Sequence, residues 1–202
     1  MSPLQLPPGR MGRLWLLGRL ELAERGVTVL EEKLRLLDEQ RQLLQDRADQ
    51  SKREWHDACC RADMWGLRAT LLGGQRAITL ATPRTVVSIT VQWVTTAGVH
   101  YPDRVECTWP SDDGVVVHTN SATVQASLAY RAAVAGAAQH AADQFALTTI
   151  DNEFRATWLR GRALSAHWLP RLRDELARIN LTLEEQDRAE AIRLRLVRLG
   201  HG

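Results

Sequence analysis

The side chains suited to metal chemistry are few, and their spacing does not favour a closed site. His56, Cys59 and Cys60 fall within about one turn of a helix-like stretch, and Cys107 or His100 are further possible ligands. Structural zinc takes four converging ligands, usually from two separated pairs. We therefore interpret these residues as seam or surface positions of a helix and predict no metal site.

Acid–base and nucleotide chemistry are not indicated either. The segment Gly73-Gly74-Gln75-Arg76 lacks the GxxxxGK[ST] frame of a phosphate loop. The paired acids Glu31-Glu32 and Glu184-Glu185 are typical of solvated helix faces. We therefore predict no catalytic residue and no cofactor-binding residue.

Composition excludes several classes of protein. The 202 residues are 45% hydrophobic and 25% charged, with a net charge of +2, whereas a nucleic-acid binder carries a strongly basic face. Cys59, Cys60 and Cys107 do not pair as a structural disulfide would, so we expect a reducing, cytoplasmic compartment. The short apolar patch at residues 14–17, interrupted by arginines on both sides, is neither a signal peptide nor a membrane span.

The elements that position these residues begin with one long helix. Residues 1–11 read as a flexible lead-in, and residues 12–72 contain no proline. Apolar residues then recur at alternating spacings of three and four, interrupted at Arg41 and Ser51, which is typical of a coiled coil. A helix of this length measures roughly 90 Å, too long for a compact domain. The main positions of this predicted seam are Leu16, Leu20, Val27, Leu30, Leu34, Leu37 and Leu44.

Residues 73–120 are predicted to form a head that contains a β-hairpin. Glycines 73 and 74 end the first helix, as C-cap glycines do. Two β-branched stretches, TVVSITVQWV and GVHYPDRVECTW, are separated by TTAG and read as paired strands. VVVH at 115–118 is either a third strand or the approach to a helix that Asn120 or Ser121 caps.

Residues 121–200 are predicted to form the second long helix. Its first third is rich in alanine, which allows a neighbouring helix to approach closely, and Pro170 must kink it or mark a joint. Its seam continues through Leu172, Leu176, Ile179 and Leu183. The predicted fold is therefore dominated by α-helix: an antiparallel two-helix coiled coil with a small β-hairpin insert at the far end. A rod of this kind has little interior for an active site, so we predict that the chain is not an enzyme.

If the two helices end flush, Leu16 lies near Leu196, Trp55 near Thr157 and Trp65 near Leu147. Both ends of the chain would then meet in a basic tip, because neither end carries an acid. The residues of this predicted tip are Arg10, Arg13, Arg193, Arg195 and Arg198.

Local sequence resembles the D subunit of V-type (vacuolar or archaeal-type) ATPases. The stretch LPPGRMGRLWLLGRLELAERGVTVLEEKLRLLDEQ is similar to that family's N-terminal helix, with Arg25, Gly26 and Lys33 as matching residues. The second long helix of that family is similar to the stretch LSAHWLPRLRDELARINLTLEEQDRAEAIRLRLVRL, which contains Pro170. Glycine at position 26 is informative, because glycine costs a helix about 1 kcal/mol.

The resemblance implies a central rotor stalk of a rotary ATPase that transports protons or sodium ions. It implies that the basic tip contacts the catalytic A and B subunits, that the coil binds the F subunit, and that the C/d subunit links the hairpin end to the membrane rotor ring. The protein would then be cytoplasmic and peripheral to the membrane, with no direct insertion and no nucleic-acid partner. The alternative is a coiled-coil scaffold or tether that belongs to no motor.

Overall fold

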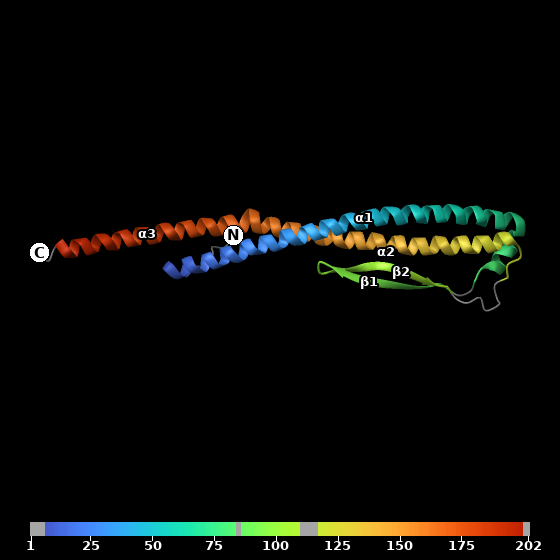
Figure 1. The fold of residues 1–202 in the computed structure, drawn as a ribbon, viewed down its shortest axis with the longest axis horizontal. Coiled ribbons are helices and arrows are strands. Elements are labelled where there is room, and N and C mark those ends of the chain that lie inside the picture. Colours follow the sequence, from blue (N-terminus) through green and yellow to red (C-terminus); the bar gives the residue numbers. More distant parts are fainter. Residues whose placement is uncertain (1–6, 84–85, 110–116, 200–202) are drawn as a thin grey trace. The chain divides into compact units, whose positions relative to one another are not determined.

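The computed structural model describes residues 7–83, 86–109 and 117–199 (Figure 1). Its elements, in chain order, are α1 (Gly9–Ala81), β1 (Ser88–Thr96), β2 (Val99–Thr108), α2 (Ser121–Ala163), the π-helical turn η1 (Leu164–Trp168) and α3 (Leu169–Leu199). Helix α1 packs against α2 and α3, and β1 and β2 form a two-stranded antiparallel sheet. The predicted fold class, a helical coil with a small hairpin, is confirmed.

The chain divides into two compact units, which are described separately. Unit 1 comprises Met1–Arg35 and Arg155–Gly202, and unit 2 comprises Leu36–Phe154. Each unit therefore takes one segment of α1 and one segment of the returning helices. In both units these segments run antiparallel, as the residue pairs given below establish.

In unit 1, α1 packs against η1 and α3 through an apolar cluster. Leu16 and Leu172 are fully buried, and they share the cluster with Ala23 and Leu169. On the outside, Glu24 pairs with Arg173 at 2.8 Å, and Arg13 Nε donates to Asn180 Oδ1 at 2.8 Å. The burial of Leu16 against Leu172 shows that apolar contact between the two helices stabilises this unit.

In unit 2, small residues let α1 and α2 approach closely. Two clusters of this unit are built mainly from alanine, and a Cβ atom added at Gly136 would lie 3.3 Å from Trp55 Cα. The prediction that the alanine-rich stretch permits close approach is confirmed. The alanines of these clusters are Ala58, Ala62, Ala69, Ala122, Ala126 and Ala133.

The predicted register of the two helices is wrong by about five helical turns. Trp55 stacks on His140, with ring centroids 5.5 Å apart, rather than lying near Thr157. The prediction assumed that the helices end flush. In unit 1, however, Arg10 in the first turn of α1 pairs with Asp187, so residues 188–199 of α3 continue past that turn. Heptad spacing fixes which face of a helix is buried but leaves sliding by whole heptads undetermined.

The first helix changes direction at its glycine pair. Gly74 has φ 63° and ψ −178°, outside the helical region, and a second helical segment then runs to Ala81. A positive φ of this kind is accessible to glycine at little cost. Leu72, which directly precedes the glycine pair, is largely exposed.

The hairpin forms where the β-branched residues predicted it, with a two-residue turn. Ala97 and Gly98 both have positive φ, as a type I′ turn requires. Val115 and Val116 of the proposed third strand lie outside the described residues. Val117 belongs to no strand, and its N–H donates to Leu80 O at 3.0 Å. Helix α2 is capped by Asn120, whose Oδ1 accepts from Thr123 N–H at 2.9 Å.

Candidate functional site: the attachment of the hairpin to the coil

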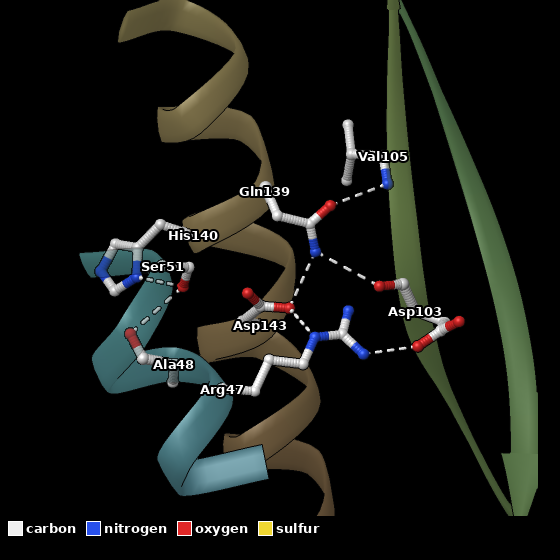
Figure 2. Close-up of polar contacts among 8 residues, drawn as sticks. All are labelled: Arg47, Ala48, Ser51, Asp103, Val105, Gln139, His140 and Asp143. Carbon is white, nitrogen blue, oxygen red and sulfur yellow. Dashed lines mark hydrogen bonds and ion pairs between the residues drawn. The ribbon is translucent and has the colours of Figure 1, made fainter. Parts of the chain in front are cut away.

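An arginine in unit 2 joins three elements. Arg47 of α1 reaches Asp103 Oδ1 of β2 with Nη1 at 2.5 Å, and Asp143 Oδ1 of α2 with Nε at 2.7 Å (Figure 2). The planar guanidinium presents its donors in a rigid fork, so it can hold two carboxylates at fixed positions. We call Arg47, Asp103, Asp143 and Gln139 the hairpin clamp.

Gln139 completes the clamp on the hairpin side. Its Nε2 donates to Asp143 Oδ1 at 2.9 Å and to the backbone carbonyl of Asp103 at 3.3 Å. Its Oε1 accepts from the backbone N–H of Val105 at 3.1 Å. A side chain of α2 therefore occupies part of the outer edge of strand β2, as Figure 2 shows.

A β-bulge places Asp103 in this position. Gln92 is opposite Arg104 and Trp93 is opposite Pro102, so Asp103 is the extra residue of strand β2. An extra residue bends its strand and redirects side chains. Here the bulge coincides with the residue whose carboxylate meets Arg47.

The central carboxylate of the clamp is buried, so it requires a cation and hydrogen-bond donors nearby. The side chain of Asp143 is only 1% exposed, and its Oδ2 has no hydrogen-bond partner among the described residues. Burial tends to lower the pKa of Arg47, but its hydrogen bonds to Asp103 and Asp143 outweigh that effect and raise the pKa. Arg47 therefore stays charged throughout the physiological range.

Apolar packing supplements the clamp at the tip of the hairpin. Val99 and Tyr101 share a buried cluster with Leu37, Leu44 and Ile150 of the coil. Next to this cluster Trp93 stacks on His100, with ring centroids 5.0 Å apart, and meets Phe145 edge-on. The hairpin thus lies along the coil of unit 2, held by its tip and by the clamp (Figure 1).

Sequence reasoning did not single out the clamp. Arg47 directly precedes Ala48, which lies on the seam of the first helix. A charged residue beside the seam is commonplace on a helix, so the sequence does not mark Arg47 as special. One signal was present: Asp143 is the only acid between Asp113 and Asp151, in an alanine-rich helix. A lone carboxylate in such a stretch favours a specific partner.

A second polar layer lies one helical turn from the clamp, at a break in the predicted seam. Ser51 is buried, and its Oγ lies 3.2 Å from Nδ1 of His140 and donates to the carbonyl of Ala48 (Figure 2). Arg41, the other predicted break, pairs with Asp38 and Asp151 and lies over the ring of Phe154. The polar side chains at both breaks of the seam therefore have polar or aromatic partners.

The predicted seam residues lie on the buried sides of the helices. In unit 1, Leu20 and Val27 pack partly buried against the cluster of Leu16 and Leu172, as do Leu176 and Ile179. Leu30, Leu34 and Leu183 are half-buried. In unit 2, Leu37 and Leu44 are buried.

The motif residues lie in unit 1. A Cβ atom at Gly26 would lie 3.3 Å from Leu164 Cδ2, so the glycine faces the π-helical turn. In that turn Leu169 N–H donates to Leu164 O, and Pro170, which has no N–H, follows directly. Arg25 pairs with Glu21 on the surface, and Lys33 is half-buried and interacts with another group of the chain.

The structure does not bring the predicted tip arginines together. Arg10 pairs with Asp187 at 3.6 Å and Arg13 bonds to Asn180, whereas Arg193 and Arg195 are exposed farther along α3. Asp187 and Arg195 are separated by roughly 12 Å of helix. Arg198 belongs to α3, but its side chain lies outside the described part of the chain.

Cys60 Sγ lies 3.8 Å from His56 Nε2, four residues earlier on α1. Within residues 7–83, 86–109 and 117–196, no three His, Cys, Asp or Glu side chains converge as metal ligands would. In the same part of the chain, no helix is both long enough and apolar enough to cross a membrane.

Comparison with protein families decides the assignment. The model of the ATP synthase D subunit family matches residues 15–198. The chain belongs to this family. It is therefore a stalk component of a rotary ATPase, from a family that is generally non-catalytic. Residues 15–198 include both helical segments of each unit and the hairpin. Comparison with individual curated proteins gave no match.

Proposed function

We propose that the protein is the central rotor shaft of a V/A-type ATPase, which transmits torque between the catalytic A/B hexamer and the membrane rotor ring. The family match over residues 15–198 is the observation that carries this proposal. In this role, proton or sodium transport is coupled to ATP synthesis or hydrolysis, and the ATP chemistry takes place on neighbouring subunits. The chain itself is not an enzyme and binds no cofactor.

The construction of each unit supports torque transmission. In unit 1 the two helices interlock through buried leucines, and in unit 2 through alanines at close approach. Close-packed side chains resist sliding and twisting, because each displacement opens voids or forces overlap. A shaft needs this property along its length.

The proposed neighbours are the A and B subunits, the F subunit on the coil, and the C/d subunit toward the membrane ring. Through these neighbours the cytoplasmic shaft is held peripherally at the membrane. Arg193 and Arg195 are exposed on α3 and are proposed contacts of the catalytic head, together with Arg198. Arg10 and Arg13 also belong to the proposed contact set, although each has a partner within the chain.

The test is reconstitution. The chain is expressed with A, B and F subunits from the same genome, and the purified complex is assayed for ATP hydrolysis with and without the chain. A defined complex whose turnover depends on the chain supports the shaft. A chain that associates with none of these subunits would instead favour a coiled-coil scaffold outside any motor.

Charge neutralisation tests the head contacts. Arg193→Gln/Arg195→Gln should weaken association with the A and B subunits while the melting temperature of the isolated chain stays unchanged. Arg178→Gln is the matched control, because Arg178 is exposed on the same helix and its ion pair among the described residues is with Glu175. Equal assembly of both variants would remove α3 from the proposed contact.

A further inference from the structure

Strand β1 has an edge that the rest of the described chain leaves unused. The strand runs over nine residues, from Ser88 to Thr96, and its first six residues are all exposed. In a two-stranded sheet each strand has one outer edge, where alternate residues direct N–H and C=O away from the partner strand. Among the hydrogen bonds of the described residues, the backbone of β1 bonds only to β2.

Strand β2 shows what a protected edge looks like in the same hairpin. It contains Pro102, the bulge at Asp103 and the charged residues Arg104 and Glu106. On its outer edge Gln139 bonds to the N–H of Val105 and the carbonyl of Asp103. Proline, bulges, charges and covering side chains are the usual devices that keep an edge from pairing with another chain.

Within the described part of the chain, strand β1 has none of these devices. From Thr85 to Val99 the sequence contains no charged residue and no proline. Apolar residues alternate along one face: Ile89 is 49% exposed, Val91 is 37% exposed, and Trp93 follows. Ser88, Thr90 and Gln92 occupy the other face, followed by Val94, which packs against the buried cluster of the coil. An open edge of this length and composition is a template for strand addition.

We infer that β1 is a docking edge that receives an extended segment of another stalk protein as a third strand of the hairpin sheet. The partner strand is uncharged and β-branched or aromatic on one face. Its apolar side chains continue the row of Ile89, Val91 and Trp93, where a charge would be desolvated without a counter-charge. The inference rests on the proposed function, because that function supplies the partner.

Area considerations favour a different protein of the complex over a second copy of this chain. Nine residues of strand span about 30 Å, and pairing along that edge alone buries far less than the roughly 1,200 Å² of a stable interface. Two copies joined only through β1 would therefore dissociate. A neighbour already held elsewhere on the stalk needs only this small additional contact, because its segment is present at high effective concentration.

Residue-resolved hydrogen exchange on the chain, alone and in the reconstituted complex with the A, B, F and C/d subunits, is the test. In the free chain, about every second amide of β1 points outward and should exchange freely, while those bonded to β2 are protected. In the complex the outward amides should slow by at least about tenfold. Side-chain docking on the sheet face would not produce this alternation.

Ile89→Lys/Val91→Lys should abolish the new protection, because it places charges on the apolar row. Val86→Lys is the matched control: this valine is 88% exposed and precedes the strand. An unchanged melting temperature of each variant establishes that the hairpin still folds. Protection that survives the double substitution would overturn the inference.

The outcomes separate the inference from the function on which it rests. A complex that forms without new protection in β1 overturns the docking edge and leaves the shaft intact. Protection that appears in the isolated chain as its concentration rises would assign the edge to self-association and overturn the inference. Failure of any complex to form refutes the proposed function and the docking edge together.

Discussion

Replacing Arg47 by glutamine tests whether the hairpin clamp stabilises unit 2. The substitution leaves the carboxylate of Asp143, only 1% exposed, without its cation and with Gln139 as its remaining hydrogen-bond donor among the described residues. Removing one partner of a buried ion pair costs about 3–5 kcal/mol. Because the Arg47 side chain is itself one-third exposed, water can partly replace it, and we expect the lower end, about 3 kcal/mol.

The measurement is urea unfolding followed by circular dichroism, with the free energy of unfolding extrapolated to water. Arg25→Gln is the control, because its ion pair with Glu21 is exposed and contributes at most about 0.5 kcal/mol. The double substitution Arg47→Met/Asp143→Leu removes both charges and should recover most of the lost stability, since apolar replacements of buried pairs are tolerated.

An Arg47→Gln chain as stable as the Arg25→Gln chain would refute this reasoning. It would mean that the carboxylate of Asp143 requires no cation in the folded state. A double variant no more stable than Arg47→Gln would indicate that Arg47 acts through its contact with Asp103 and not through the buried carboxylate.

Three further tests concern the packing and capping, and each is measured by the same unfolding assay. Leu37→Ala should cost about 2–5 kcal/mol of stability because Leu37 is fully buried. The control Leu36→Ala changes a neighbouring exposed residue and should be nearly neutral. Equal losses of stability would contradict the placement of Leu37 on the buried seam. A Cβ atom at Gly161 would meet no atom within 4 Å, so Gly161→Ala should stabilise the helix by up to about 1 kcal/mol. A Cβ atom at Gly136 would lie 3.3 Å from the backbone of α1, so Gly136→Ala should bring no such gain. A gain in stability from both glycine substitutions would show that the helices can separate freely. Asn120→Ala should cost about 1 kcal/mol through loss of the N-cap bond to α2, and an unchanged stability would place the helix start elsewhere.

Local rules were sufficient for the elements of this fold. The alternation of three and four along residues 12–72 predicts a helix with one apolar side, and Leu16, Leu37 and Leu44 are indeed buried. The β-branched stretches predict the strands, and the glycine pair predicts the end of the first helical run at Gly74, although a second helical segment continues from there to Ala81. These features follow from side-chain spacing and backbone sterics, which act over a few residues.

The clamp could not be predicted in this way, because its members come from three distant parts of the chain. Arg47 and Asp103 look like ordinary charged residues in their local sequence, and the isolated carboxylate of Asp143 does not reveal which partners it has. Their meeting depends on a bulge in β2 and on the hairpin lying along the coil. A polar network of this kind exists only once the elements have packed.

The sequence by itself therefore determined the helices, the hairpin, the buried face of each helix and the resemblance to a family of stalk subunits. The tertiary structure alone decided the register of the two helices, which places Trp55 on His140 and leaves Arg193 and Arg195 beyond the first turn of α1. The physical reason is that a heptad repeat looks nearly the same after each shift of seven residues. Only particular contacts, such as small residues at close approach and the polar layers at Arg47 and Ser51, distinguish one shift from another.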